Sequence, residues 1–380
     1  MLYLDFAASA PIRIRALEIL EESSRLDFAN PSASHKFGRD VSKKVEGARE
    51  FFLKSIQGTT SYNLIFTSSA TESNNTIIKG IGVGQGEKVF LCQADHPSLT
   101  VPCNNLSKKG VKVLSIPLKS DSTIDEGRFL ELLDESVKLI LLTQINSQSG
   151  VVNDCFNLAG KIKKLFKNIH IHVDAVQSFS KLNISLEDGS VNSLSVSSHK
   201  IGGPKGIAGL FFKKGNEPLP LIEGGGQEFS LRSSTVATPL ILGFKEALQE
   251  CLENQDKKLF EAKENYFYLR DELKRRISDV SFPFGDRSNS SPFILVLVIP
   301  RISSDIILRH LESKDIYISS TSACSSKIKG DNPVFKELNL SPKFYKNVLR
   351  ISFDERVERK SLLQFVEAIE NIYLDLRHLI

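Results

Sequence analysis

A lysine follows a strand-like segment and precedes a glycine-rich turn. Lys200 comes after the apolar run 194–197, and three glycines stand within residues 201–206. In an open α/β sheet this position faces the crevice at the carboxyl ends of the strands. An amine that burial or nearby cations keep neutral can form a Schiff base there. For an isolated His-Lys pair, however, a surface lysine beside a turn is the commoner explanation.

A carboxylate stands at the end of an earlier strand-like run. Asp174 closes the run 169–173 and precedes Lys200 by 26 residues. The pyridine nitrogen of pyridoxal 5'-phosphate (PLP) stays protonated beside a carboxylate, and the ring then acts as an electron sink. A single aspartate at a strand end is more often a helix cap. Asp174 and Lys200 at neighbouring strand ends together predict a PLP site.

A third candidate site is a strand that leads directly into a hydroxyl-rich helix start. The strand at 64–66 is followed by Ser68 to Asn75. Free backbone N–H groups and the helix dipole bind anions at such a start. Thr71 and the amides beside it are therefore candidate phosphate ligands. Ser69 with Glu72, or the equivalent pair one residue earlier, also forms a capping box, and the two roles are compatible.

These residues need a scaffold of alternating strands and helices. Between residues 62 and 214, short apolar runs alternate with helix-like stretches, which predicts an α/β fold with a largely parallel sheet. Expected strands lie at 64–66, 89–91, 111–114, 138–145, 169–173, 194–197 and 209–212, and expected helices at 71–79, 126–135 and 156–166.

The second half of the chain follows a different pattern. Residues 236–278 show helical periodicity and predict one long helix or two. A smaller α+β block follows, with expected strands at 293–299, 316–319 and 348–353 and helices at 304–312 and from 359 onward. We place a large PLP-binding domain at residues 12–250. We assign residues 1–11 and 251–380 to a small domain.

The composition excludes several classes of protein. The chain has 380 residues, 41% of them hydrophobic, and its 49 basic and 45 acidic residues give a net charge of +4. An even spread of so small a charge argues against a nucleic-acid partner. No apolar run reaches the length of a membrane span, and the N-terminus does not resemble a signal peptide. Five scattered cysteines without a CxxC motif predict a reducing, cytoplasmic location.

No metal site is expected. His170 and His172 alternate along one predicted strand, but no further cluster of metal-ligating residues accompanies them. Packing in the core is therefore the better explanation for both histidines.

Nine short blocks of the chain occur in an order and at a spacing typical of one known family. They are residues 3–8, 29–35, 66–75, 95–98, 172–178, 197–206, 232–235, 322–326 and 349–353. Together they resemble the fold-type I PLP enzymes of aminotransferase class V, most closely the cysteine desulfurases of the nitrogen-fixation and iron–sulfur-assembly group. The resemblance implies a mainly parallel seven-stranded sheet in the large domain and a smaller α+β C-terminal domain.

The resemblance also implies which residues hold the cofactor. Lys200 would bind PLP covalently and move protons, and Asp174 would pair with the pyridine nitrogen. His96 would stack on the ring and assist acid–base steps, and Gln177 would hydrogen-bond the phenolic oxygen, near which Asn146 is a further candidate. The implied phosphate site comprises Ala70, Thr71, Ser197, His199 and, from the neighbouring subunit of a homodimer, Thr235.

Three further residues are implied for the substrate, L-cysteine. Arg350 would bind the carboxylate, for which a planar two-donor guanidinium is well suited. Asn30 would lie near the same end of the substrate. Cys324 lies in a polar stretch without apolar periodicity, which predicts a loop. Its thiolate would take the substrate sulfur as a persulfide and pass it to an acceptor protein, either an iron–sulfur scaffold or a tRNA-thiolation carrier.

One block departs from the family pattern. The usual Asn-Asn-Glu-x-Gly is replaced by Asn146 to Gly150, so counting back from Gly150 places Ser147 at the position that normally touches the phenolic oxygen. Either Asn146 substitutes or that contact is weakened. Gln148 replaces an acid. These changes support a second hypothesis, in which the chain is another class V enzyme, such as an aminotransferase or a selenocysteine or cysteine-sulfinate lyase, that does not need Cys324.

A third hypothesis is a non-catalytic relative that mainly binds a partner. The presence of Lys200, Asp174, His96 and Arg350 argues against it. Failure of the protein to take up PLP would favour it.

Overall fold

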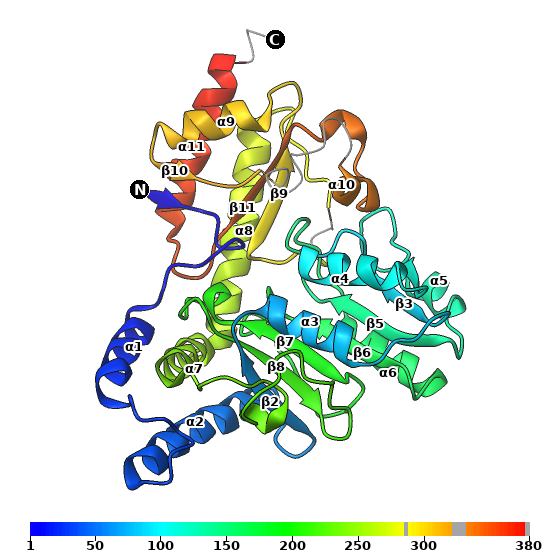
Figure 1. Ribbon diagram of the computed structural model, residues 1–380. Helices are drawn as coiled ribbons and strands as arrows, with labels where there is room; N and C mark the ends of the chain where they lie inside the picture. The colour runs from blue at the N-terminus through cyan, green and yellow to red at the C-terminus, as the bar shows by residue number, and fades with distance from the viewer. Residues whose placement is uncertain (285–287, 321–331, 377–380) are drawn as a thin grey trace.

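A seven-stranded sheet forms the centre of the lower half of the molecule in Figure 1. The computed structural model describes residues 1–284, 288–320 and 332–376. The strand order is β2-β8-β7-β6-β5-β3-β4; β8 runs antiparallel to both neighbours and the other pairings are parallel. This confirms the predicted α/β fold. The strands are β2 (Tyr62–Thr67), β3 (Lys88–Leu91), β4 (Lys112–Ser115), β5 (Val137–Thr143), β6 (His170–Asp174), β7 (Ser193–Ser197) and β8 (Ala208–Lys213).

Helices cover both faces of this sheet, and its central strands contribute to both sides of the core. In β5, Leu139 and Leu141 pack into one buried cluster, and Ile140 and Leu142 into another. Burial on both faces explains why the strand is a nearly continuous apolar run. The helices are α1 (Ile14–Leu26), α2 (Lys36–Ser55), α3 (Ala70–Gly80), α4 (Pro97–Ser107), α5 (Glu126–Glu131), α6 (Cys155–Leu165) and α7 (Thr238–Leu252).

The helical stretch after residue 236 is two helices. α7 ends at Leu252, and α8 (Gln255–Arg276) follows after Asn254, whose φ of 54° lies in the left-handed region. A residue in that conformation cannot continue a right-handed helix. α8 then runs from the large sheet to the upper half of the molecule (Figure 1).

The upper half is built on two small sheets. β9 (Ile294–Val298) pairs antiparallel with β11 (Val348–Ser352), and β1 (Leu2–Tyr3) pairs parallel with β10 (Ile316–Tyr317). α9 (Ser304–Glu312), α10 (Pro333–Glu337) and α11 (Arg359–Leu376) complete this part. Within the described ranges, none of the helices has the length and hydropathy needed to cross a membrane.

The N-terminal segment connects the small sheets to the large one. The carbonyl of Leu4 accepts a hydrogen bond from the Ser352 amide, and the Ala10 amide donates to the carbonyl of His199. Residues 2–10 therefore run from the small sheets to the turn that carries Lys200. The domain boundaries given above stay a prediction.

Candidate functional site

A cavity of about 330 Å³ lies at the carboxyl ends of β5, β6 and β7. This is where an open α/β sheet binds its ligands. The structure brings ten of the predicted site residues to its wall. They are Ala70, Thr71, His96, Asn146, Asp174, Gln177, Ser197, His199, Lys200 and Arg350.

Lys200 follows β7 in a short 3-10 turn, Ser198–Lys200. Its Nζ donates to the carbonyl oxygens of Ala7 (2.5 Å) and Ala8 (2.8 Å). Burial, with the positive charges of Lys181 and Arg350, lowers the pKa of Lys200 to about 8. A neutral amine is therefore accessible close to physiological pH, and this is the form that attacks a carbonyl.

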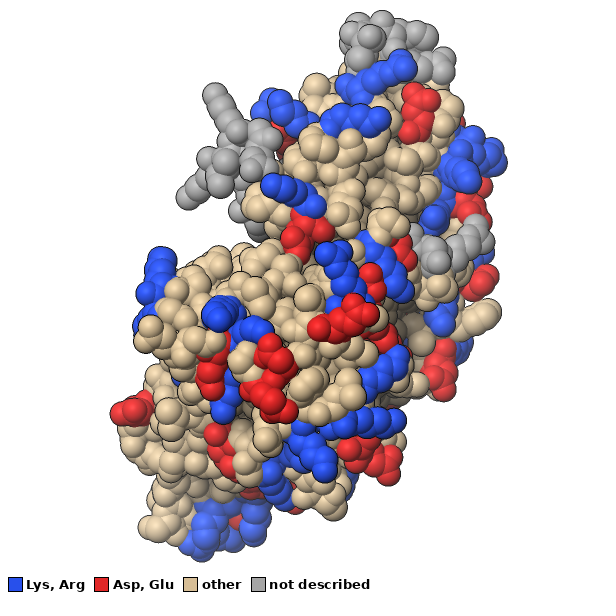
Figure 2. All heavy atoms as spheres, turned by 90° about the vertical axis from the view of Figure 1, so that its right-hand side faces the viewer, with Lys and Arg blue, Asp and Glu red and all other residues tan. Residues whose placement is uncertain are grey.

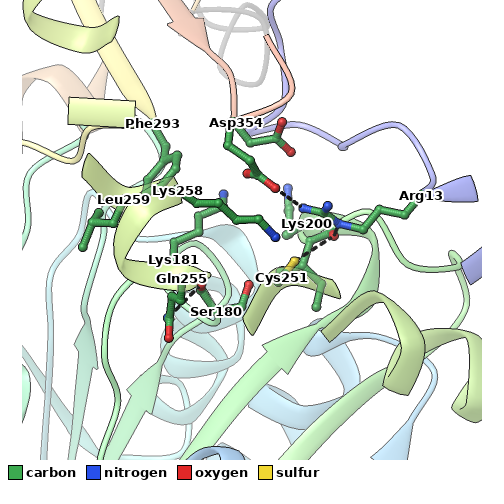
Figure 3. Close-up of a pocket in the computed structure, with 12 residues that line it drawn as sticks. Arg13, Ser180, Lys181, Lys200, Cys251, Gln255, Lys258, Leu259, Phe293 and Asp354 are labelled. Atoms are coloured by element: carbon green, nitrogen blue, oxygen red, sulfur yellow. Dashed lines mark hydrogen bonds and ion pairs between the residues drawn. The ribbon is translucent and has the colours of Figure 1, made fainter. Parts of the chain in front are cut away.

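A second, smaller cavity lies behind Lys200. Figure 3 shows Lys181, Lys258 and Cys251 lining it together with Lys200. The Nζ of Lys181 lies 5.4 Å from the centre of the Phe293 ring, a cation–π geometry. The positive charge of Lys181 is thus held close to Lys200, where it helps to lower the pKa of the Lys200 amine.

Glycines allow the turn after Lys200 to close. Gly202 has a φ of +79°, which glycine adopts without a steric penalty. A Cβ on Gly203 would collide with the Ser198 hydroxyl. The two glycines therefore reflect the local geometry of the lysine turn.

Asp174 ends β6 with its carboxylate buried. Oδ1 accepts from the Val176 amide and Oδ2 from Nδ2 of Asn74, each at 3.0 Å. Burial raises the pKa of Asp174, and these two hydrogen bonds oppose that rise. A cation placed against this carboxylate would favour the ionised form further.

His96 is the N-cap of α4 and faces the same cavity. Its Nδ1 accepts from the backbone amide of Ser98 at 3.1 Å. Burial lowers the pKa of His96. The neutral ring therefore carries its proton on Nε2.

The start of α3 forms another part of the wall. The Ser69 hydroxyl accepts from the Glu72 amide at 3.2 Å, and Oε2 of Glu72 accepts from the Ser68 amide at 2.7 Å. The predicted capping interaction is confirmed. Thr71 and His199 line the cavity beside this helix end. Burial and nearby lysines lower the pKa of His199 to about 4, so its neutral ring can donate to an anion.

Arg350 extends from β11 into the cavity wall. Its Nη1 donates to the Ser147 carbonyl and its Nη2 to Oδ1 of Asp5, both at 2.8 Å. Nε is buried and has no hydrogen-bond partner among the described residues. An unpaired donor on a buried guanidinium is suited to a carboxylate ligand.

The amino-acid sequence matches the aminotransferase class-V family over residues 2–365. The chain belongs to the class-V aminotransferase family. Cysteine desulfurase IscS of Dictyoglomus turgidum is 31% identical over 378 residues, which cover 99% of this chain and 95% of that protein. A structure titled NifS-like protein superposes with a TM-score of 0.91 at 27% identity, covering 99% of this chain and all of that one. A structure of SspA in complex with cysteine superposes with a TM-score of 0.81 at 28% identity, covering 93% of this chain and 99% of that one.

Class-V aminotransferases use PLP, and the residues that line this cavity fit that cofactor. Lys200 supplies the amine, Asp174 a buried carboxylate and the start of α3 an anion site. Gln177 donates to the Ala7 carbonyl at 2.8 Å, while its buried Oε1 has no partner within the described part of the chain. Buried polar atoms normally have partners, so this free atom indicates space for a polar ligand.

The Asn146 side chain forms hydrogen bonds within the wall of the cavity. Its Nδ2 donates to the Ala94 carbonyl at 3.1 Å, and its Oδ1 accepts from the amides of Gln148 (2.9 Å) and Ser149 (3.0 Å). The side chain thus closes the turn that departs from the family pattern. Its contact with the phenolic oxygen stays a prediction.

Three predicted residues are not assembled at the cavity. Asn30 is exposed, and its Oδ1 accepts from the Ser32 amide at 2.9 Å. Thr235 is also exposed and does not line the cavity of its own subunit. Cys324 lies outside the described residues. The roles of these three stay predictions.

The sequence analysis missed four residues that the structure places around this class-V site. Asp5 pairs with Arg350, and Lys181 stands behind Lys200. Asn74 and Ser98 lie behind Asp174 and His96. A signal for Asn74 was present: a helix start with four successive polar residues, 72–75, must bury some of them when it packs on a sheet.

Proposed function

We propose that the chain is a cysteine desulfurase that converts L-cysteine to L-alanine and leaves the sulfur as a persulfide on Cys324. One observation carries this proposal. A single cavity combines Lys200, whose pKa is lowered to about 8, a buried carboxylate at Asp174 and a guanidinium with a free donor at Arg350. Relatives named cysteine desulfurase match the chain along nearly its whole length.

The residues divide the work of the reaction. PLP, when bound, supplies the electron sink for the charge that develops at the substrate α-carbon. Lys200 would hold the cofactor, and its neutral amine would be the base that takes the α-proton of the substrate. Arg350 binds the substrate carboxylate, which orients the α-carbon toward Lys200. His96 carries its proton on Nε2, and from there it would donate a hydrogen bond to atoms of the substrate or cofactor on which negative charge develops.

Sulfur transfer balances without an external oxidant. The C–S bond of L-cysteine breaks, and an S–S bond forms between its sulfur and Cys324. The former β-carbon gains the proton that makes it the methyl group of alanine. The attacking cysteine must be a thiolate. Burial raises the pKa of the thiol in each of the four described cysteines, Cys92, Cys103, Cys155 and Cys251, which argues against a carrier role for them.

The sulfur on Cys324 would then pass to an acceptor protein, an iron–sulfur scaffold or a tRNA-thiolation carrier. Basic and acidic side chains are interspersed on the face shown in Figure 2, and the whole chain has a net charge of only +4. A protein acceptor suits this surface better than direct contact with nucleic acid. We place the reaction in the cytoplasm, where free cysteines persist.

We also propose a homodimer with shared active sites. Large apolar side chains are exposed on two stretches, residues 12–37 and 219–229, and the predicted phosphate ligand Thr235 follows the second stretch. Exposed large apolar side chains mark a candidate protein interface. The members are Ile12, Ile14, Leu17, Leu26, Phe28, Phe37, Leu219, Leu221, Ile222 and Phe229.

One observation favours a second candidate function. Gln148 lines the cavity, and its Oε1 has no partner in the described ranges, where the family pattern has an acid. A neutral amide in this wall changes the electrostatics of the cavity. Another class V reaction, such as transamination or removal of selenium or sulfinate from a cysteine analogue, is the alternative.

The test compares products from several amino acids. Wild-type protein with PLP and a thiol reductant should form alanine and sulfide from L-cysteine faster than alanine from L-selenocysteine or L-cysteinesulfinate. Lys200→Ala should lose the reaction and also lose cofactor trapping by borohydride. Lys205→Ala, an exposed lysine in the same turn, is the control and should retain both. Activity only on another amino acid would support the alternative.

A further inference from the structure

Asn74 lies behind the cofactor cavity and is completely buried. It stands on α3 and uses all of its polar groups. Nδ2 donates one hydrogen to Oδ2 of Asp174 at 3.0 Å and the other to the hydroxyl of Ser98 at 2.9 Å. Oδ1 pairs with Nε2 of His172 at 3.0 Å.

The direction of the hydrogen bonds on the His172 side follows from chemistry. An amide oxygen only accepts, so Nε2 of His172 carries the proton. Burial lowers the pKa of His172 to about 3, which keeps the ring neutral, and its Nδ1 must therefore accept. The Ser193 hydroxyl lies 2.8 Å from this Nδ1 and donates to it. Nε2 of His170, 2.8 Å from the same hydroxyl, then donates to Ser193.

The direction on the Ser98 side is also determined. The Ser98 hydroxyl accepts from Asn74, and its single hydrogen is directed to Nδ1 of His96 at 2.8 Å. The Ser98 amide donates to the same nitrogen at 3.1 Å. Two donors on Nδ1 leave Nε2 of His96 as the protonated nitrogen.

We propose that Asn74 is a positioning residue that couples two groups that would contact the cofactor ring, holding Asp174 as an acceptor and His96 in its Nε2–H tautomer. A reversed amide would turn an oxygen toward the Asp174 carboxylate and toward the Ser98 oxygen. The ionised Asp174 carboxylate prevents this reversal, because it can only accept and so requires the amide nitrogen on its side; Oδ1 then faces His172 and accepts from its Nε2–H. The inference rests on the proposed function, in which Asp174 would pair with the pyridine nitrogen of PLP and His96 would stack on its ring.

The first test replaces the amide by groups of similar size. Asn74→Asp puts an oxygen against Asp174, and Asn74→Leu removes the polar atoms. We expect each to raise the dissociation constant for PLP at least tenfold and to shift the pH at which the visible band of the bound cofactor titrates. Asn104→Asp, an exposed residue of α4, is the control and should change neither quantity. Circular dichroism monitors folding in each sample.

The second test addresses one branch and avoids a large change in the core. Ser98→Ala removes the hydroxyl donor to His96 and leaves the Asn74–Asp174 hydrogen bond intact. The charges facing His96 are Asp174 and Lys200, and both remain. With one donor to Nδ1 lost, protonation of His96 becomes easier. We expect the acidic limb of kcat/KM to move to higher pH, while PLP affinity stays within about threefold of wild type.

The outcomes separate this inference from the proposed function. Wild-type protein that takes up no PLP would contradict the proposed cofactor site itself. Wild-type protein that binds PLP, together with folded Asn74 variants of unchanged affinity and unchanged band titration, would overturn the role of Asn74. If the Asn74 variants do not fold, an unshifted acidic limb in Ser98→Ala overturns the coupling on its own.

Discussion

At the scale of single residues, the site depends on groups placed behind the residues that face the cavity. The sequence predicted Lys200, Asp174, His96 and Arg350 from strand ends and family blocks, and the structure brings them to one cavity. It assigned no role to Lys181 or Asp5, because neither follows one of the strands that the sequence analysis expected. Their places depend on how distant segments pack, which local patterns do not encode.

Lys181 should set the pH at which Lys200 becomes reactive. The pKa of Lys200 is lowered to about 8 by burial and by the neighbouring charges of Lys181 and Arg350. Removing a positive neighbour favours the protonated amine, so Lys181→Met should raise this pKa, by about one unit for a charge held in a partly buried setting. The rate of PLP uptake by the apoprotein, measured against pH, should level off at correspondingly higher pH.

The control for this change is Lys257→Met, an exposed lysine on α8. It should leave the profile unchanged. A Lys181→Met profile that coincides with that of wild type would show that Lys181 does not tune the amine.

Arg350 should determine the affinity for the substrate carboxylate. Its two Nη groups are held by Ser147 and Asp5, and Nε is free among the described residues. A hydrogen bond to a charged group contributes roughly 1.5–3 kcal/mol, so Arg350→Ala should weaken apparent L-cysteine binding at least about tenfold. Substrate titration of the visible band measures this. Equal affinity in wild type and variant would remove Arg350 from the substrate site, and exposed Arg359→Ala serves as the control.

At the scale of elements, the sequence predicted helices where apolar spacing and caps agreed. The expected helices at 71–79 and 156–166 are α3 (Ala70–Gly80) and α6 (Cys155–Leu165). The sequence analysis did not predict α4, which contains Pro102 and few strong helix formers. Proline removes a backbone donor and obscures the helical pattern. His96 nevertheless depends on α4, since it caps the start of that helix.

The start of α3 should depend on Glu72. Its buried carboxylate accepts from Ser68 and from Nε of Arg232, which lies 2.9 Å away. Glu72→Gln should therefore lower the free energy of unfolding by about 1–3 kcal/mol at pH 7, the typical effect of losing hydrogen bonds to a charged group. Urea denaturation measures this, with exposed Glu131→Gln as the control.

This effect has a defined pH dependence. The pKa of Glu72 is lowered from its ordinary value of 4.5 by hydrogen bonds from Arg232 and Ser68, which outweigh the effect of burial. A lowered carboxylate pKa stabilises the fold above the ordinary pKa, and the stabilisation is lost as the pH falls through the folded value. Wild type and Glu72→Gln should converge in stability as the pH falls below 4.5 and through the lowered pKa of Glu72. A difference that persists there would contradict an electrostatic origin.

At the scale of the whole molecule, the active site depends on segments that are distant in sequence. Residues 2–10 pair with β10 and β11 and bring the carbonyls of Ala7 and Ala8 to Lys200. The alternation of strands and helices predicted a largely parallel sheet, and the family resemblance implied its seven strands. The exact meeting of the N-terminus, the lysine turn and Arg350 follows from packing between sheets, which no single segment encodes.

The proposed homodimer should be measurable by mass in solution. Sedimentation equilibrium at micromolar concentration should give twice the mass of one chain. Phe28→Glu places a charge on the first exposed apolar stretch, where Phe28 is 76% exposed, and should shift the equilibrium toward monomer. Phe260→Glu, on α8 and 64% exposed, is the control and should stay dimeric. A wild-type protein that is monomeric would contradict the shared-site proposal.

The most direct test of the whole account is the effect of Cys324→Ser on alanine formation from L-cysteine. The account predicts that the variant binds PLP with an unchanged visible band and forms little or no alanine, while Cys92→Ser remains active because burial already raises the pKa of the Cys92 thiol. Alanine formation by Cys324→Ser at the wild-type rate would contradict a persulfide on Cys324 and would favour the alternative class V reaction.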